Sequence, residues 1–448
     1  MLVYDRYDIW EVKPDGSGGR MLTNGIGRAS QIVFRYPRTE QPQSTEPEEG
    51  ALRQRQADEP VVPTSRPILL SAVDDRTKAS GLYRVTVGGT NGPAKVVMMD
   101  KAIGVPIKAR DADVYVFTTS RFEEFPDLWT ASGSFTDMKK VSDANPQQTQ
   151  YNWGRSELID YVNTRRQASA RDAHEAGGLR SVEEATRCIV YIYEQLSQNL
   201  HRYVPPAPGG SSINVTRYAS NGYIILQPDI VYDLGYPGES ALKCVLPAVQ
   251  KVLSMGFVDP ARVGIQGHSW GGYQISYMIT KTNIFRAVEA GASVVEMFGG
   301  YGGIRWGTGM SRAFQYEKTQ SRIGVPPWEN PYLYMENSPL FGIKNIKTPY
   351  LTMANDEDDA VPWQQGIEFF TAMRRLGKEA YMFVYNGEKH GLRQRENQKH
   401  WTVHMAEYFD YFLKGAPKPD WMEHGVPYLD KGRQGRFCFS SRRVLDQK

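Results

Sequence analysis

The sequence predicts two unlike parts: a mostly parallel α/β sheet covered by helices on both faces, preceded by an incomplete all-β region. Three observations lead to this prediction. From about residue 188 onward, short continuous apolar runs alternate with amphipathic segments, which is typical of parallel strands buried on both faces. Within that part, a glycine-flanked serine lies between an apolar strand and a helix. Before about residue 155, short alternating strands are separated by turns rich in glycine and proline.

The amino-terminal part, residues 1–155, repeats one hairpin design. A Tyr-Asp-Ile-Trp strand at 7–10 is followed by a turn and a return strand at 20–23. A Pro-Asp-Leu-Trp strand at 126–129 is followed, at the same spacing, by Val-Ser at 141–142. A third unit at 81–87 has Tyr where the others have Trp. Such repeats predict propeller-like blades, and the alternative is an ordinary β-meander.

The predicted propeller is incomplete. Blades of roughly 40 to 50 residues give about three to four in residues 1–155, whereas a closed propeller needs at least four. We therefore expect the chain to be the carboxyl-terminal part of a longer protein, or the product of an internal start. Apolar surface left where further blades would pack favours self-association. Residues 38–66 are rich in Pro, Glu, Gln and Arg and predict a solvated loop or insertion.

Residues 188–448 are predicted to form the α/β domain with a carboxyl-terminal tail. The segment 156–187 is rich in Arg, Ala and Glu, fits neither part, and is predicted to be an atypical linker or disrupted segment. The predicted strands of the α/β domain are 188–193, 223–226, 264–267, 350–353 and 381–385, and the predicted helices are 239–255, 273–280, 363–376 and 399–413.

Composition excludes several classes of protein. Hydrophobic residues make up 40% of the chain, which excludes wholesale disorder. Lys and Arg total 53 against 50 Asp and Glu, so no strong field favours nucleic acid or an acidic membrane as the main partner. No apolar run reaches the length of a membrane span, and no secretory signal begins this chain, which leaves its localisation open. Three cysteines without a CxxC motif (Cys188, Cys244, Cys438) predict neither a disulfide framework nor a zinc site.

The sequence Gly267-His268-Ser269-Trp270-Gly271 matches the G-x-S-x-G nucleophile elbow. In this motif the serine sits on a strained turn between a strand and a helix. The glycines let the two backbones pass closely, so that the serine hydroxyl is exposed above the sheet. An apolar strand before the motif and a helical pattern after it are the context that the motif requires. Ser269 is therefore predicted to be a nucleophile, and the alternative is a chance glycine turn.

A serine nucleophile needs a base and a group that orients the base, which follow in α/β-hydrolases in the order Ser, Asp, His. Four acidic residues at 356–359 come directly after the strand that ends at Met353, where the acid is expected. His390 lies in a glycine-flanked loop after the last predicted strand and is the predicted base. His400 and His404 have the i, i+4 spacing of a metal pair on a helix, but no acidic partner motif accompanies them, so no metal site is predicted.

The segment 256–273 closely resembles the elbow of prolyl oligopeptidase-family serine peptidases, the group of oligopeptidases, dipeptidyl peptidases and acylaminoacyl peptidases. The resemblance covers about residues 188–415, and the amino-terminal hairpins match the family's propeller. It implies an α/β-hydrolase domain. In the family the acid precedes a valine by three positions, which implies Asp358, with Asp356 as the reserve. The family histidine lies in a short H-G loop, matching His390.

The resemblance also implies an oxyanion hole made by Tyr193, which closes an early apolar strand, and by the Trp270 backbone N–H. The paired glutamates of dipeptidyl peptidases are not identified, so substrate-binding residues stay unknown and exopeptidase action is not carried over. The predicted function is hydrolysis of short peptides through Ser269, Asp358 and His390, with an acyl-enzyme and without a metal or organic cofactor. The alternatives are an esterase-type hydrolase on the same fold and an inactive remnant that acts only in binding.

Overall fold

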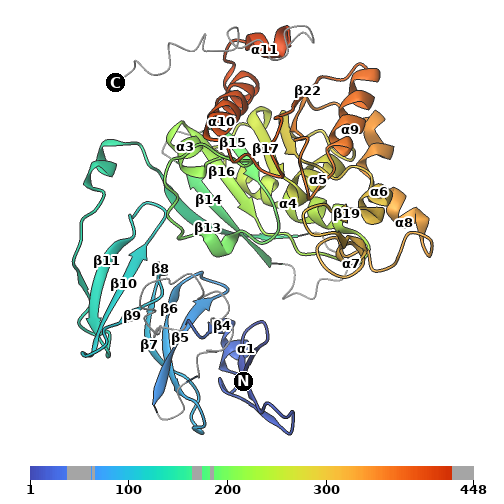
Figure 1. Ribbon diagram of the computed structural model, residues 1–448. Coiled ribbons are helices and arrows are strands. Elements are labelled where there is room, and N and C mark those ends of the chain that lie inside the picture. The colour runs from blue at the N-terminus through green and yellow to red at the C-terminus, as the bar shows by residue number, and fades with distance from the viewer. Residues whose placement is uncertain (38–61, 63–65, 164–173, 182–185, 426–448) are drawn as a thin grey trace.

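A computed structural model describes residues 1–37, 62, 66–163, 174–181 (backbone only) and 186–425. Its largest sheet has eight strands in the order β13-β14-β16-β15-β17-β18-β21-β22 (Figure 1). The pairs from β16 to β22 are parallel, whereas β14 pairs antiparallel with both β13 and β16. The strands are β13 (Arg155–Val162), β14 (His174–Ser181), β15 (Arg187–Tyr191), β16 (Tyr223–Pro228), β17 (Val263–His268), β18 (Ala287–Gly291), β21 (Tyr350–Met353) and β22 (Ala380–Phe383).

Helices cover both faces of this sheet, as the continuous apolar runs predict. Within β15, Val190 belongs to a core cluster with residues of α4, α5 and α9, while Ile189 belongs to a cluster with residues of α3 and α10. The prediction of a doubly covered, mostly parallel sheet is confirmed. The helices are α3 (Val215–Ser220), α4 (Pro237–Ser254), α5 (Trp270–Met278), α6 (Met297–Gly302), α7 (Ala313–Glu317), α8 (Pro331–Glu336), α9 (Gln364–Arg375), α10 (Arg395–Phe409) with a π-helical continuation (Asp410–Lys414), and α11 (Asp420–Glu423).

The strand order places the predicted site residues at one edge of the sheet. After β15 the chain crosses to β16 on one side of β15 and then returns to β17 on its other side. Because these strands are parallel, the carboxyl ends of β15, β17, β21 and β22 all point to the same edge. Tyr193, Ser269, Asp358 and His390 each follow one of these ends. Ligands of open α/β sheets bind at such an edge.

The prediction that 156–187 is a linker or disrupted segment is wrong for most of that stretch. β13 and β14 form an antiparallel pair at the margin of the large sheet, and β14 pairs with β16. In β13, Ile159 and Tyr161 are buried in the core, while Asp160 and Val162 are exposed. A margin strand with one solvated face alternates in polarity, so it lacks the continuous apolar run that identifies the central strands.

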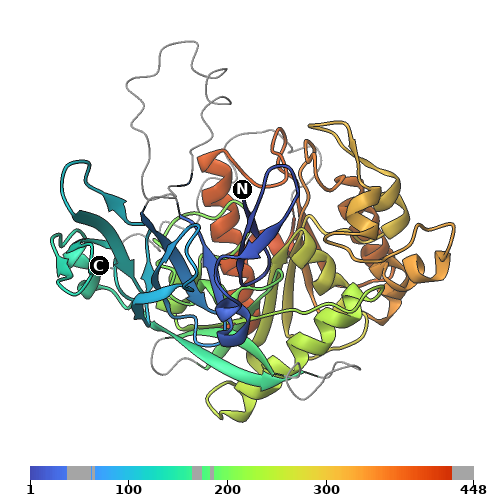
Figure 2. The same ribbon diagram turned by 90° about the horizontal axis from the view of Figure 1, so that it is seen from below.

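Three small antiparallel sheets form the amino-terminal part and stack against one another. In Figure 2, seen from below, they lie in front of the large sheet. Neighbouring residues of one strand face different sheets: Leu70 packs in a cluster with Ile9 of the first sheet, and Leu69 in a cluster with Phe117 of the third. The strands are β1 (Leu2–Tyr4), β2 (Ile9–Val12) and β3 (Gly19–Met21) in one sheet, β4 (Ile32–Arg35), β5 (Pro67–Asp74), β6 (Ser80–Thr86) and β7 (Ala94–Met99) in the next, and β8 (Ala102–Ile103), β9 (Ile107–Lys108), β10 (Val114–Ser120), β11 (Asp127–Ser132) and β12 (Lys139–Lys140) in the third.

The two hairpins with the Asp-Ile/Leu-Trp signature each contain an equivalent side-chain hydrogen bond. Asp8 accepts from the Thr23 hydroxyl at 2.6 Å, and Asp127 accepts from the Ser142 hydroxyl at 2.6 Å. Thr23 directly follows Leu22, and Ser142 directly follows Val141; these are the Leu and Val that lie at the same distance after the Trp of each hairpin. Both aspartates are buried, and a buried carboxylate must be hydrogen-bonded. The repeated sequence therefore encodes the same local contact in two different sheets.

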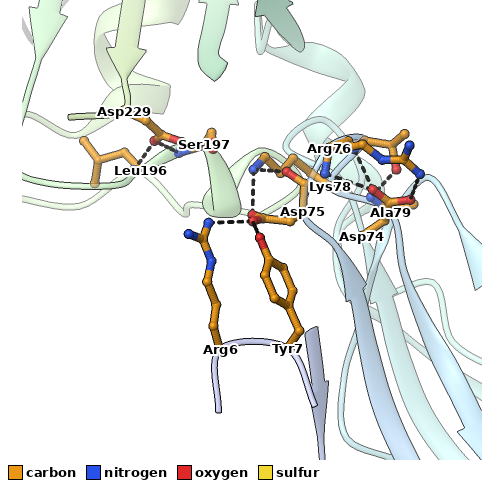
Figure 3. A network of polar contacts seen from close by, with 11 residues as sticks. Arg6, Tyr7, Asp74, Asp75, Arg76, Lys78, Ala79, Leu196, Ser197 and Asp229 are labelled. Atoms are coloured by element: carbon orange, nitrogen blue, oxygen red, sulfur yellow. Dashed lines mark hydrogen bonds and ion pairs between the residues drawn. The ribbon is translucent and has the colours of Figure 1, made fainter. Parts of the chain in front are cut away.

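Polar contacts also join the first two small sheets (Figure 3). Asp75 accepts from Arg6 at 2.9 Å and from the Tyr7 hydroxyl at 3.3 Å, and its other oxygen lies 3.3 Å from the buried Lys78 ammonium. Burial alone would raise the pKa of Asp75, but Lys78 and Arg6 outweigh burial and lower it. Asp75 is therefore held as a carboxylate between the two sheets.

Some predictions concern residues that the structure does not describe. Cys438 lies outside the described residues, and so does the predicted solvated loop at 38–66 apart from residues 62 and 66. Cys188 and Cys244 are buried. Among the described residues, no helix has the length and apolarity that crossing a bilayer requires. The same residues hold no group of three or more His, Cys, Asp or Glu side chains arranged around a metal position.

Candidate active site

Ser269 occupies the turn between β17 and α5, as the elbow motif predicts. Its backbone has φ 60° and ψ −116°, a conformation that non-glycine residues rarely adopt and that costs free energy. The last glycine of the motif and the glycine that follows it are required by close backbone contacts. A Cβ on Gly271 would lie 2.5 Å from the Ile192 carbonyl oxygen, and one on Gly272 would lie 2.5 Å from the Gly291 carbonyl oxygen. These glycines therefore allow the elbow to pack between the ends of β15 and β18.

Asp358 and His390 are in direct contact. The His390 Nδ1–H donates to the Asp358 carboxylate, with distances of 2.7 Å to Oδ2 and 3.0 Å to Oδ1. The Asp358 side chain is 1% exposed, while the His390 side chain is 28% exposed. Asp358 Oδ1 also accepts the Ala360 and Val361 backbone N–H groups at 2.8 and 2.9 Å. With Nδ1 protonated, the His390 Nε2 is left as a proton acceptor.

The reserve acid, Asp356, has a different role. Its two oxygens accept the Asn386 side-chain amide and the Gly387 backbone N–H, each at 2.8 Å. Asn355 donates to the Lys389 carbonyl oxygen at 2.7 Å. These bonds fasten the loop after β21 to the loop after β22. Asp356 therefore holds the histidine loop in place but does not contact His390, whereas Asp358 does.

His268 connects the elbow to the histidine loop. Its Nε2–H donates to the His390 carbonyl oxygen at 2.6 Å, and the two imidazole rings are 4.9 Å apart. Burial, and secondly the neighbouring His390, lower the pKa of His268 to about 3, so its ring is neutral at pH 7. The residue directly before Ser269 is thus hydrogen-bonded to the backbone of His390, which ties the elbow to the histidine loop. The elbow motif leaves this position unspecified, so no sequence signal identified this role.

The two predicted oxyanion donors come from different elements, one from the start of α5 and one from the loop after β15. The Trp270 backbone N–H is at the first position of α5, where a helix leaves its N–H groups without intrahelical partners. The Tyr193 hydroxyl accepts from the Gln320 side chain at 3.1 Å, and its own proton stays available for a further acceptor. Gln320 and Ser269 line the same small pocket. The Tyr193 backbone is held against α5, because Gln274 donates to its carbonyl oxygen at 2.7 Å.

The loop that follows Tyr193 is held by a buried carboxylate. Asp229, just after β16, accepts the Leu196 and Ser197 backbone N–H groups at 2.6 and 2.8 Å (Figure 3). It also accepts the Ser197 hydroxyl at 2.5 Å. These bonds satisfy the polar groups of a loop that turns away from the sheet immediately after β15. They were not anticipated from the sequence, because they join residues more than 30 positions apart.

Other polar residues at this edge were also missed by the sequence analysis. Glu388 is 1% exposed and accepts the Arg393 and Gln394 backbone N–H groups at 2.7 and 3.0 Å, just before α10 begins. Burial alone would raise the pKa of Glu388, but these hydrogen bonds and one from Asn397 lower it. Arg305 and Arg312 line the pocket next to Ser269. They lie in a segment between β18 and β21 in which the sequence analysis identified no motif.

His400 and His404 pack against each other on α10. Their rings stack on α10 with centroids 3.9 Å apart. His400 Nδ1 is hydrogen-bonded to the Tyr385 hydroxyl at 2.8 Å, and His404 Nδ1–H donates to the His400 carbonyl oxygen at 2.7 Å. Burial, and secondly His404, lower the pKa of His400 to about 4. This histidine pair is part of the packing between α10 and the loop after β22.

The buried histidines predict a loss of stability in mild acid. The folded state keeps His400 neutral down to about pH 4, whereas an imidazole in the unfolded chain binds a proton near pH 6.5. The unfolded state therefore binds more protons in this window, and stability falls as the pH drops from about 6.5 to about 4. His400→Gln still offers the Tyr385 hydroxyl an acceptor. As the pH falls, the melting temperature of this variant should decrease less steeply than that of the wild type, the two slopes differing by roughly 2–4 °C per pH unit. Thermal melts of both proteins between pH 7 and pH 4 measure this, with the exposed His424→Gln as the control. Equal slopes in all three proteins would contradict the prediction.

Residues 237–416, which contain Ser269, Asp358 and His390, match the model of the prolyl oligopeptidase family. The resemblance identified at the elbow is thereby confirmed. Curated relatives that match it include the uncharacterised peptidase YuxL of Bacillus subtilis, 26% identical over 176 residues, and the acylamino-acid-releasing enzyme of Arabidopsis thaliana, 26% identical over 180 residues.

These two matches cover 38% and 40% of this chain, but only 25% and 24% of those two relatives. The chain thus spans about a quarter of the length of the curated relatives it matches. A solved acylaminoacyl peptidase of Pyrococcus horikoshii has a similar fold, with a TM-score of 0.60 and 19% identity. That similarity covers 80% of this chain and 56% of the Pyrococcus chain.

Proposed function

We propose that this protein is a serine peptidase that hydrolyses peptide bonds of short peptides through an acyl-enzyme. The observation that supports it most strongly is the His390 Nδ1–H hydrogen bond to the buried Asp358 at 2.7 Å, in a loop that His268 joins to the strained elbow of Ser269. An aspartate bonded to Nδ1 holds the imidazole in the tautomer whose Nε2 accepts a proton. The names of the relatives, a peptidase and an acylamino-acid-releasing enzyme, support the same reaction class.

In the proposed mechanism, His390 Nε2 takes the Ser269 hydroxyl proton as the serine oxygen attacks the peptide carbonyl carbon. Asp358 stabilises the imidazolium that results and remains ionised. The carbonyl oxygen becomes an oxyanion and accepts hydrogen bonds from the Trp270 N–H and the Tyr193 hydroxyl, each contributing about 3 kcal/mol. His390 then gives its proton to the leaving amine as the C–N bond breaks. A water molecule, deprotonated by the same imidazole, hydrolyses the acyl-serine ester and restores Ser269.

The proposal extends to domain organisation. The three stacked sheets in residues 1–155 are proposed to be propeller-type blades, which the shared Asp–hydroxyl contact of the repeated hairpins supports. The catalytic domain is then proposed to begin at Arg155 with β13, earlier than residue 188, because β13 and β14 complete the large sheet. In this arrangement the blades lie next to the catalytic domain, where too few of them are present to close a cover over the active site.

A fluorophosphonate probe tests the proposal without knowledge of the substrate. Such probes phosphonylate only a serine that an adjacent base has activated. We expect one probe per chain, attached to Ser269, as measured by intact mass and peptide mapping. Heat-denatured protein is the control and should not react. Absence of labelling in the folded protein would favour the alternative of an inactive binding protein.

Matched amide and ester substrates separate a peptidase from an esterase-type hydrolase. The triad alone does not select between the two, because both reactions pass through the same acyl-enzyme. A peptidase should cleave a dipeptide anilide as well as the corresponding dipeptide ester. Hydrolysis of the ester alone, with full fluorophosphonate labelling, would support the esterase alternative.

A further inference from the structure

A layer of buried polar side chains lies beneath the elbow, between β17 and β18. Gln266 and His268 point to the same face of the sheet, because alternate residues of a strand share a face. In the register of the two strands, Glu289 stands opposite Gln266, and Gly291 stands opposite His268. Gln266 and Glu289 are fully buried, and His268 is nearly so. This layer is on the side of the sheet that α10 covers, since Ala287 packs in a cluster with residues of that helix.

Two side chains in this layer each have one polar atom without a hydrogen-bond partner. His268 Nε2–H donates to the His390 carbonyl oxygen at 2.6 Å, so Nδ1 is an acceptor, and Nδ1 has no partner among the described residues. Glu289 Oε2 accepts the Gln266 side-chain amide at 2.6 Å, and Oε1 has no partner in the same part of the chain. Buried polar atoms in folded proteins are nearly always hydrogen-bonded, so both atoms imply a contact.

The two atoms border one position, the place where Gly291 lacks a side chain. A Cβ on Gly291 would lie 2.7 Å from His268 Nδ1 and 2.9 Å from Glu289 Oε1. Both atoms therefore face the same small space. They are close enough to meet directly after a small side-chain rotation, or through one water molecule. A larger residue at position 291 would close this space.

The hydrogen bonds of this layer run in one direction and make Glu289 the donor. The Ile213 backbone N–H donates to Gln266 Oε1 at 3.1 Å, which turns Gln266 Nε2 toward Glu289. Because Glu289 Oε2 accepts that amide, the proton of a carboxylic acid at Glu289 belongs on Oε1. Burial raises the pKa of Glu289 well above its usual range, and among the described residues only the Gln266 bond opposes burial. Glu289 is therefore neutral at pH 7 and can donate to the atom of His268 that needs a donor.

We propose that Glu289, in its protonated form, is a positioning residue for the proposed catalytic base: its Oε1–H donates to His268 Nδ1, directly or through one water molecule, and His268 thereby ties the His390 loop to the elbow. The proposal rests on the proposed peptidase function and adds a residue that acts through His268. Without this donor, the neutral imidazole of His268 can carry its proton on Nδ1 instead. Nε2 and the His390 carbonyl oxygen would then both be acceptors, and the link between the elbow and the histidine loop would break.

Two substitutions at this position separate a hydrogen-bond donor from a negative charge. Glu289→Gln keeps an N–H donor toward His268 and an oxygen toward Gln266, so kcat for a dipeptide anilide should stay within about threefold of the wild type. Glu289→Met has a similar volume and no donor, so kcat should fall about 10- to 100-fold with little change in KM. In a His268→Phe background, Glu289→Met should cause no further loss. The matched control is the exposed Glu379→Met, just before β22 at the opposite edge of the sheet, which should keep the wild-type kcat.

Nitrogen NMR of histidine-labelled protein tests the proposal without turnover, because the two ring nitrogens report which of them carries the proton. The His268 signals are assigned by their loss in His268→Phe. In the wild type and in Glu289→Gln, His268 should carry its proton on Nε2, whereas in Glu289→Met a measurable fraction should carry it on Nδ1. The wild-type spectrum remains decisive where Glu289→Met fails to fold.

Three results would overturn the positioning role of Glu289. The first is a wild-type His268 with its proton on Nδ1. The second is an equal loss of kcat in Glu289→Gln and Glu289→Met, because a donor at this position would then not suffice. The third is an undiminished kcat in Glu289→Met. Each of them would leave the peptidase proposal standing. Absence of fluorophosphonate labelling in the folded wild type would instead defeat the proposed function, whatever the tautomer of His268.

Discussion

Ser269→Ala is expected to lower kcat for a cleavable dipeptide anilide by on the order of 10⁶-fold and to abolish fluorophosphonate labelling. The covalent intermediate cannot form without the serine oxygen, and His390 then has no hydroxyl proton to accept. The strained φ of 60° at this position is set by the elbow backbone, so an alanine there should leave the fold intact. Turnover assays and intact-mass labelling of wild type and variant measure both effects.

The matched control for this variant is Ser134→Ala, which removes an exposed hydroxyl in the amino-terminal sheets. It should retain full activity and full labelling. Labelling of Ser269→Ala at the wild-type rate would show that the reactive serine lies elsewhere and would contradict the elbow assignment. A circular dichroism spectrum that matches the wild type excludes unfolding as the cause of lost activity.

Asp358→Asn is expected to lower kcat by about four orders of magnitude. The asparagine amide would favour the wrong imidazole tautomer, with the proton on Nε2, and would no longer stabilise the imidazolium. The loop itself should persist, because an asparagine oxygen can still accept the Ala360 and Val361 N–H groups that Asp358 now binds. Steady-state assays with the same anilide measure the loss, and KM should change little.

Asp356→Asn provides the comparison within the same loop. Asp356 binds Asn386 and Gly387 and not His390, so this variant should lose less than about tenfold in kcat. If Asp356→Asn were instead the more severe variant, the assignment of the acid to the position three residues before Val361 would be wrong by two residues.

The central strands and long helices could be predicted because their signal is local. β16 and β21 are buried on both faces and are largely apolar runs, while β17 is marked by the elbow motif that directly follows it. α4 and α9 show the amphipathic periodicity of helices that bury one face. The observed bounds differ from the predicted ones by only a few residues at the ends.

Two kinds of strand were missed, for different physical reasons. β13 at the margin of the sheet alternates in polarity and therefore resembles a surface segment. β18 is fully buried but contains Glu289, which interrupts its apolar run. Burial raises the pKa of Glu289 well above its usual range, and the Gln266 side chain donates to it at 2.6 Å. Only a partner on the neighbouring strand makes this glutamate acceptable in the core, and the local sequence does not contain that partner.

Within the site, the sequence by itself determined the residues whose role depends on local geometry. The strand, the G-x-S-x-G turn and the helix identify Ser269, because the strained turn and its flanking glycines lie within a few residues of chain. The glycine-flanked position of His390 after the last strand was likewise a local signal. The choice between Asp356 and Asp358 needed more than this. Both are carboxylates in one acidic loop, and family resemblance alone favoured the second.

Only the tertiary structure decided which groups meet across the sheet edge. Asp358 contacts His390, and Asp356 contacts Gly387, because hydrogen bonds between the two loops set their register. His268 gains its role from a carbonyl 122 residues away, and Glu289 lies near it only because β17 and β18 are neighbours. These contacts depend on how parallel strands gather their carboxyl ends at one edge. The local sequence encodes each strand, but the order of the strands in the sheet determines which loops become neighbours.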